Sequence, residues 1–281
     1  MPAKRIPVAI AYDFDGTLAP GNMQDREFIP DVQVTPAKFW GEVKALAKEH
    51  DMDEILAYLE LMLQKANAAQ ISIKKETFAE YGRKLDFFPG VEDWFARTNI
   101  HAKGLGLKLS HYIISSGLRE MIHGTRIAKH FDYIFASGFR YDHNGIAVWP
   151  ALAVNYTNKA QYLFRINKGI QNSYDNTTIN QVMAENERPL PFANMIYLGD
   201  GETDIPAMKM VTYQGGRAIA VYPKGRGGAK GKALCKELVE NKRANGAAAA
   251  DYTTGGNLDK AVKAILEQIA ARERFKSATK V

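Results

Sequence analysis

Two carboxylates at the end of an apolar run are the residues of this chain best suited to chemistry. The run from Val8 to Tyr12 predicts a buried strand, and Asp13 and Asp15 follow it with Gly16 and Thr17 directly behind. Ligands of open α/β sheets bind at the carboxyl edge of the strands, so we expect a site there. One acid would be enough to cap a helix. Two neighbouring acids repel unless a cation or a shared proton holds them, so the pair favours an active site.

A second apolar run also ends in acid. Met195 to Leu198 predicts another buried strand, and the segment Gly-Asp-Gly-Glu-Thr-Asp that follows contains Asp200 and Asp204. Asp204 is also placed to cap the helix that starts there. If both strand ends share one sheet edge, Asp13 and Asp200 offer the hard oxygen ligands that suit Mg²⁺.

A third strand end carries hydrogen-bond donors. The predicted strand 109–115 is closed by Ser115, Ser116 and Gly117, and a helix is predicted over 118–129. A strand, a small-residue loop and a helix in this order point backbone N–H groups at an anion. The alternative is that Ser115 only caps the strand end.

One of two lysines completes the set. Lys159 lies near the start of a predicted helix over 157–167 and therefore near the expected sheet edge, whereas Lys168 lies at its far end. We favour Lys159 as the cation of the site and interpret Lys168 as a surface residue with a buried stem. Carboxylates, a cation and N–H donors together are what a phosphoryl group needs while its charge shifts in the transition state.

The rest of the chain predicts the elements that position these groups. Apolar strands alternate with helices through the second half, which indicates an α/β fold with a doubly wound parallel sheet. Further strands are expected at 133–139 and 218–221, and a hairpin turn at 142–145. The polar span 171–191 is expected to hold a short helix or to be a mobile surface segment.

Helical spacing dominates the stretch between the first two strands. Three helices are expected there, beginning near Pro36, Ile55 and Lys74, and none of these segments is typical of a strand. We interpret them as a helical bundle inserted into the sheet domain. The predicted division is a core of residues 1–19 and 89–281 and an inserted helical cap of residues 20–88.

Composition limits the function classes. The 281 residues are 46% hydrophobic and 24% charged, and Cys235 is the single cysteine, which excludes an internal disulfide. The sequence has neither a signal-peptide pattern nor the roughly 20 apolar residues of a membrane helix, so we expect a soluble, cytoplasmic protein without membrane partners. The net charge is +6, with a basic excess between Lys224 and Arg243. Because no aromatic residues interleave with these charges, a solvated helix face is favoured over a nucleic-acid site.

The order of these motifs resembles the haloacid dehalogenase superfamily, and the pair Asp13-x-Asp15 resembles its phosphatase branch. The resemblance implies a Rossmann-like core with a helical cap. It also implies that Asp13 attacks phosphorus and that Asp15 is the general acid and base. Mg²⁺ would be held by Asp13, Asp200 and the Asp15 backbone carbonyl, with Asp204 orienting this shell. Ser115, the Ser116 N–H and Lys159 would bind the phosphate.

The resemblance is to phosphoserine phosphatase-like members with a helical cap, and it implies a Mg²⁺-dependent phosphatase acting on a small phosphorylated metabolite. Those phosphatases carry an acid in the loop after the first motif, where this chain has Asn22, so phosphoserine itself does not follow. Arg26, Trp40 and Glu42 are candidate substrate contacts. Two alternatives remain open at this point: a phosphomutase of the same superfamily, and a non-catalytic metal- or nucleic-acid-binding protein.

Overall fold

A seven-stranded sheet forms the centre of the molecule in the computed structural model, which describes residues 5–225 and 228–279. The strand order is β4-β3-β2-β1-β5-β6-β7, and all neighbours are parallel except β3 and β4, which form the expected hairpin. This confirms the predicted doubly wound α/β architecture. The strands are β1 (Ile6–Tyr12), β2 (Leu107–Leu118), β3 (Tyr133–Tyr141), β4 (Ala147–Leu152), β5 (Met195–Gly199), β6 (Arg217–Tyr222) and β7 (Gly246–Ala249).

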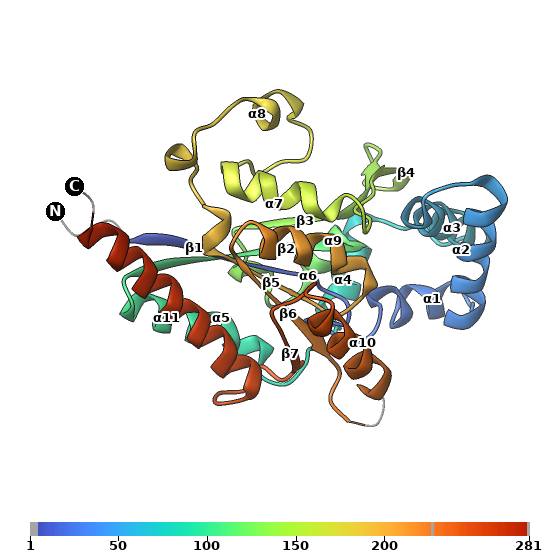
Figure 1. Ribbon diagram of the computed structural model, residues 1–281. Coiled ribbons are helices and arrows are strands. Elements are labelled where there is room, and N and C mark those ends of the chain that lie inside the picture. The colour runs from blue at the N-terminus through green and yellow to red at the C-terminus, as the bar shows by residue number, and fades with distance from the viewer. Residues whose placement is uncertain (1–4, 226–227, 280–281) are drawn as a thin grey trace.

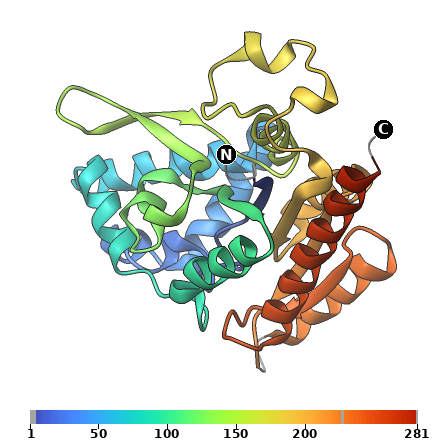
Figure 2. The ribbon, with the colours of Figure 1, turned by 90° about the vertical axis from the view of Figure 1, so that its left-hand side faces the viewer.

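Helices cover both faces of the sheet (Figures 1 and 2). One face is covered by α5 (Val91–Gly104) and α11 (Asn257–Ala278), whose buried residues include Trp94 and Leu266. The opposite face is covered by α7 (Lys159–Lys168), α9 (Ile205–Tyr213) and α10 (Ala229–Glu240), whose buried residues include Tyr162 and Met208. The polar span after α7 holds the short α8 (Asn176–Asn180), one of the two alternatives predicted for it.

Strand β1 lies at the point where the strand order changes direction. It pairs with β2 on one side and with β5 on the other, and Tyr12 is level with Ile113 and with Leu198. The chain moves outward from β1 to β3 on one side and from β5 to β7 on the other. Such a switch point opens a crevice at the carboxyl ends of the strands, and Asp13 stands at its centre.

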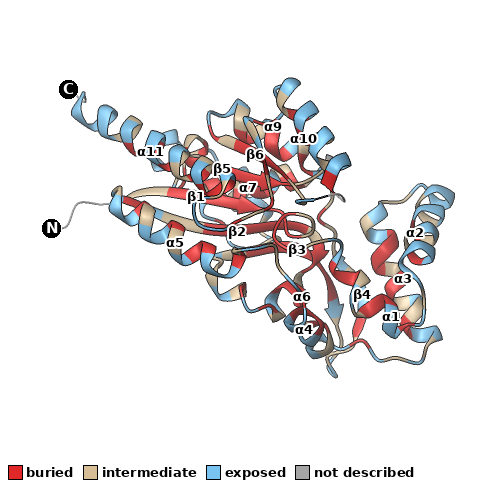
Figure 3. Ribbon diagram, turned by 90° about the horizontal axis from the view of Figure 1, so that it is seen from below, coloured by how far each residue is buried: buried red, intermediate tan, exposed pale blue. Residues whose placement is uncertain are grey.

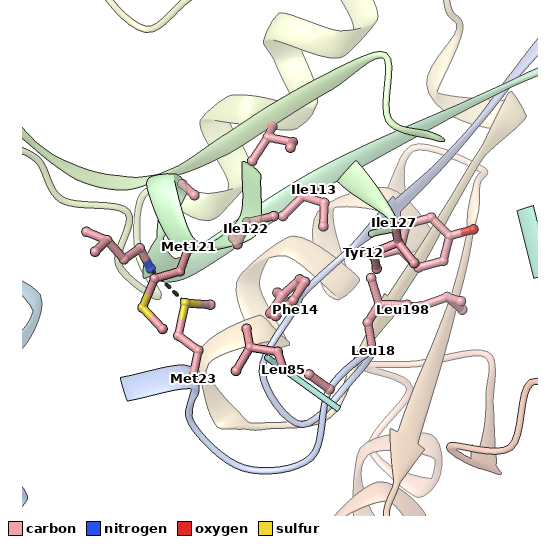
Figure 4. Packing of buried hydrophobic residues seen from close by; sticks show 14 of the residues in the cluster. Tyr12, Phe14, Leu18, Met23, Leu85, Ile113, Met121, Ile122, Ile127 and Leu198 are labelled. Atoms are coloured by element: carbon pink, nitrogen blue, oxygen red, sulfur yellow. Dashed lines mark hydrogen bonds between the residues drawn. The ribbon is translucent and has the colours of Figure 1, made fainter. Parts of the chain in front are cut away.

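The residue between the two leading acids anchors this strand end in the core. Phe14 is fully buried, and Figure 4 shows it in the apolar cluster with Leu18, Leu85 and Ile122. The backbone N–H groups of Thr17, Leu18 and Ala19 donate to the Phe14 carbonyl, so the chain turns directly after this buried ring. Packing of Phe14 therefore helps to fix the strand end that carries both carboxylates.

The helices inserted after β1 pack in two places. Figure 3 shows α4 beside α6, whereas α2 and α3 pack against each other. The Phe28 ring of α1 contacts both Phe39 of α2 and Phe78 of α4. Two glycines bring α4 close to the core: a Cβ at Gly82 or at Gly124 would overlap a carbonyl oxygen of the facing helix. These elements are α1 (Phe28–Asp31), α2 (Pro36–His50), α3 (Glu54–Ala68), α4 (Lys75–Arg83) and α6 (Arg119–Gly124).

Two boundaries and one whole strand also differ from the sequence expectations. Strand β2 continues to Leu118 through the predicted loop, with a register shift against β3 after Ser115. Helix α6 ends at Gly124, short of the predicted residue 129, because Thr125 turns into extended backbone. Strand β7 was not predicted, since its residues Gly-Ala-Ala-Ala carry none of the β-branched or aromatic side chains that favour strands. Among the described helices, none is long and apolar enough to cross a membrane.

The close contact between α4 and α6 predicts a stability effect. Gly82→Ala should lower the free energy of unfolding by about 1–3 kcal/mol, because its methyl group would meet the Met121 carbonyl oxygen. Gly41→Ala is the matched control: it lies in α2 with open space around it, so it should stabilise by about 0.5–1 kcal/mol. Urea unfolding measures both values. Equal or greater stability of Gly82→Ala would contradict the packing.

Candidate active site

A cavity of about 600 Å³ lies at the carboxyl ends of β1, β2 and β5. Helices α2 and α3 supply its opposite wall through residues such as Trp40 and Tyr58. Five residues singled out in the sequence line it together, although they come from three strand ends: Asp13, Asp15, Ser115, Ser116 and Asp200.

Three carboxylates meet below this cavity. Asp13, Asp200 and Asp204 each offer one oxygen, and these oxygens all lie within 4.8 Å of one another. Asp13 and Asp204 are buried and Asp200 is half-buried. Such a cluster of hard oxygen donors matches the ligand preference of Mg²⁺.

Asp15 faces the same cavity but is not part of the three-carboxylate cluster. Its Oδ1 accepts a hydrogen bond from the backbone N–H of Met23 at 3.1 Å. Met23 begins the short 3₁₀ turn Met23–Asp25 that leads from β1 toward the inserted helices. Its Sδ in turn accepts the Leu118 N–H at 3.2 Å, the dashed line in Figure 4. The loop after β1 therefore holds this carboxylate in position.

Lys159 is the cation of the site. Its Nζ lies 3.0 Å from Asp13 Oδ2 and 2.7 Å from Asp204 Oδ1, and its side chain is fully buried. The competing candidate, Lys168, lies at the other end of α7 and donates to the carbonyl oxygens of Ile179 and Gln181. The structure therefore places Lys159, and not Lys168, beside the carboxylates of Asp13 and Asp204.

Burial and mutual repulsion shift the protonation of this cluster. Burial and the charge of Asp204 raise the pKa of Asp13 to about 6, although Lys159 opposes the shift. Burial and neighbouring carboxylates also raise the pKa of Asp15 and that of Asp200. Burial lowers the pKa of Lys159, but the adjacent carboxylates of Asp13 and Asp204 outweigh it, and the net shift is upward. Ionisation of all these carboxyl groups together is therefore unfavourable unless an added cation compensates their charge.

Asp204 is held by four donors. Its Oδ1 accepts from Lys159 Nζ and from the Tyr197 hydroxyl, each at 2.7 Å, and its Oδ2 accepts the N–H groups of Asp200 and Gly201. Sequence reasoning missed Tyr197, which sits in the middle of β5. A tyrosine inside an otherwise apolar strand was the available signal, because a buried hydroxyl requires a partner.

Gly16 allows two strand ends to approach each other. Its φ of +72° lies in the left-handed region, and a Cβ there would overlap the Asp200 carboxylate. A side chain at this position would therefore be strained and would displace Asp200. The turn at Gly16 after β1 and the position of Asp200 after β5 therefore depend on each other.

The bulge of β2 presents polar groups to the cavity. Ser115 Oγ accepts the Gly117 N–H at 3.0 Å, which leaves its own proton free to donate. Ser116 Oγ is buried and has no partner among the described residues. Unsatisfied buried hydroxyl groups are costly, so this one suits an oxygen-rich ligand.

The candidate substrate contacts from the sequence separate into two groups. Trp40 lines the cavity, and its indole N–H donates to Asp25 at 2.7 Å. Asn22, which stands where related phosphatases carry an acid, also lines it. Arg26 instead pairs with Asp86 at the surface, and Glu42 pairs with Lys65, so neither lines it. Sequence reasoning missed further lining residues on the inserted helices, namely Gln24, Lys44, Asp53, Glu54, Ile55 and Tyr58, and also Tyr156.

The basic segment from Lys224 to Arg243 belongs largely to α10. Cys235 and Leu238 of this helix are buried, while Lys224 pairs with Asp251 and Lys236 with Glu240. Residues 226–227 lie outside the described ranges. The contacts fit the predicted solvated helix face and lend no support to nucleic-acid binding.

The fold and the cavity are those of a doubly wound α/β protein with an acid-lined pocket at its switch point. The chain belongs to the haloacid dehalogenase-like hydrolase family, whose model matches residues 10–209. A protein of Borreliella burgdorferi described as uncharacterized is 30% identical over 278 residues, spanning 89% of this chain and 93% of that protein. The family resemblance inferred from the motifs is thereby confirmed.

Solved structures share the fold at low sequence identity. A HAD family hydrolase from Salmonella enterica serovar Typhi matches with a TM-score of 0.55 at 15% identity, covering 92% of this chain and 72% of that chain. A phosphoserine phosphatase, solved as an analogue of its phospho-aspartyl intermediate, matches with a TM-score of 0.55 at 15% identity, covering 93% and 100%. The fold is phosphoserine phosphatase-like, and the family is one of hydrolases.

The buried lysine predicts a contrast between two substitutions. Lys159→Met should lower the free energy of unfolding by about 3–5 kcal/mol, because it leaves two buried carboxylates without their partner. Lys168→Met removes only hydrogen bonds to loop carbonyls and should cost about 1 kcal/mol. Chemical denaturation in EDTA measures both. A larger loss for Lys168→Met would contradict the assignment.

Proposed function

We propose that this protein is a Mg²⁺-dependent phosphatase that hydrolyses a small phosphomonoester through an aspartyl-phosphate intermediate. The observation that carries the proposal is the position of Asp13 at the floor of the cavity, 3.0 Å from a buried lysine and beside the Asp200 carboxylate. A nucleophilic carboxylate, a fixed cation and a metal-type acid pair in one pocket are the parts that phosphoryl transfer requires.

The donor set fits a magnesium ion. We assign the ligands to the carboxylates of Asp13 and Asp200 and the Asp15 backbone carbonyl, since burial and repulsion leave these acids undercompensated. Asp204 already accepts four hydrogen bonds, which supports an orienting role for it around the ligands. A bound Mg²⁺ would neutralise charge on the phosphoryl oxygens.

Each side chain of the site then has its own role in the reaction. Asp13 attacks phosphorus, and the bond to the leaving oxygen breaks while Asp15 donates a proton to that oxygen. The raised pKa of Asp15, caused first by burial, supports a proton on this carboxyl at the start. Asp15 next takes a proton from the water that attacks the aspartyl phosphate, which releases phosphate and restores Asp13. Lys159, Ser115 and the Ser116 N–H stabilise the phosphate oxygens.

The cavity supports a small substrate. Its volume of about 600 Å³ accommodates a phosphorylated metabolite, and Trp40 and Asn22 from the inserted segment face the same space. We therefore propose that residues 20–88 act as a cap that selects the substrate. We also propose that the enzyme works in the cytoplasm, a reducing compartment that its free Cys235 fits. No observation on the described residues favours a phosphomutase over a phosphatase.

Replacing the nucleophile tests the mechanism. Asp13→Asn should reduce release of phosphate from p-nitrophenyl phosphate by at least about 10³-fold, because an amide oxygen cannot form the acyl phosphate. Its thermal unfolding should remain cooperative. Asp93→Asn, an exposed acid on α5, is the control and should keep full activity. Near-normal turnover by Asp13→Asn would exclude covalent catalysis.

Metal binding should be visible without turnover. At 100 times its dissociation constant, Mg²⁺ should stabilise the wild type by about 2.7 kcal/mol, which thermal unfolding in Mg²⁺ and in EDTA measures. Asp200→Asn removes a ligand and should lose most of this shift, while Asp93→Asn should keep it. A wild type with identical unfolding curves in millimolar Mg²⁺ and in EDTA would count against the proposed ion site.

A further inference from the structure

Two hydrogen bonds tie α3 to the loops that carry the phosphate-binding groups. The Tyr58 hydroxyl donates to the Ser116 backbone carbonyl at 2.7 Å, and Asn155 Nδ2 donates to Asp53 Oδ2 at 2.5 Å. Both Tyr58 and Asp53 line the cavity. We propose that they are positioning residues, which hold the two phosphate-binding loops in their binding geometry only while α3 is seated on the core. The inference rests on the proposed function.

Tyr58 controls the bulge of β2. The register between β2 and β3 shifts between Ser115 and Leu118, so the backbone at Ser116 leaves the regular ladder and its carbonyl depends on another donor. Tyr58 supplies that donor from the opposite wall of the cavity, and its side chain is almost fully buried. Its ring also packs edge-on against Trp40, with ring centroids 5.9 Å apart. The hydroxyl is therefore held in a fixed direction by the inserted helices.

Asp53 controls the start of α7. Its Oδ1 caps α3 by accepting the N–H groups of Ile55 and Leu56, which leaves Oδ2 for Asn155. Asn155 Oδ1 accepts the N–H groups of the turn that precedes α7, and the Asn155 carbonyl accepts the Lys159 N–H at 3.0 Å. The Asp53 carboxylate thus orients the Asn155 side-chain amide, which in turn holds the backbone turn that precedes Lys159.

Tyr58 and Asp53 are not among the residues that we propose to contact the phosphoryl group or the metal ion. Each acts through a loop, one through the carbonyl of Ser116 and the other through the side chain of Asn155. Both contacts join an inserted helix to the core, so movement of α3 away from the core would release both loops together. The inserted segment would then assemble the phosphate cradle as well as choosing the substrate.

Removal of one hydroxyl tests the role of Tyr58. Tyr58→Phe keeps the ring and should raise the dissociation constant of inorganic phosphate in Mg²⁺, measured by calorimetry, by about fivefold, the value of one ordinary hydrogen bond. KM for p-nitrophenyl phosphate should rise by a similar factor while kcat changes less, because ground state and transition state lose the same contact. Tyr213→Phe, whose side chain is 85% exposed, is the matched control and should match the wild type.

Asp53→Asn gives an independent test of the second contact, and it carries the proposal if Tyr58→Phe does not fold. Asparagine still caps a helix, so α3 should persist while the charge that holds Asn155 is lost. Phosphate affinity should again fall about fivefold. Unchanged phosphate affinity and KM in both variants would overturn the proposal. It would also be overturned if the variants melt at a lower temperature but bind phosphate as tightly as the wild type when measured well below that temperature. A wild type that binds phosphate in a Tyr58-dependent way but hydrolyses no phosphomonoester would refute only the proposed function.

Discussion

The buried contact of Lys159 with Asp13 and Asp204 is the interaction on which the site depends. It joins the ends of β1 and β5 to the first turn of α7, three segments that are distant in the sequence. A charge of either sign alone at this depth would be strongly destabilising, so the three groups stabilise one another. With Asp200 beside them, three carboxylates face one lysine, and this excess of acids supports the proposed cation site.

The topology explains why these groups meet. Because β1 pairs with both β2 and β5, three strand ends open onto one crevice, and each contributes a different kind of group. The end of β1 brings carboxylates, the bulge of β2 brings hydroxyl groups, and the end of β5 brings Asp200. The inserted helices close the crevice from the other side with aromatic residues, and their contacts to Ser116 and Asn155 link that wall to the proposed phosphate-binding groups of the core.

The sequence was informative where a short residue pattern predicts where a group lies in the fold. Acids directly after apolar runs predicted both strand ends, and a lysine at a helix start could be preferred over Lys168 because parallel strands and their helices share one edge. The sequence was uninformative where packing decides. The placement of α4 depends on the absence of side chains at Gly82 and Gly124, which no hydrophobic pattern reveals. Tyr58 and Asp53 look like ordinary helix residues until the fold brings them to Ser116 and Asn155.

Trapping of the covalent intermediate tests the central claim most directly. Asp15→Asn should slow hydrolysis of the aspartyl phosphate. With p-nitrophenyl phosphate, whose leaving group needs no proton from Asp15, rapid acid quenching of this variant in Mg²⁺ should preserve the adduct. The account predicts that mass spectrometry finds one phosphoryl group on the peptide that contains Asp13. Turnover without any adduct, or an adduct on a different residue, would contradict it.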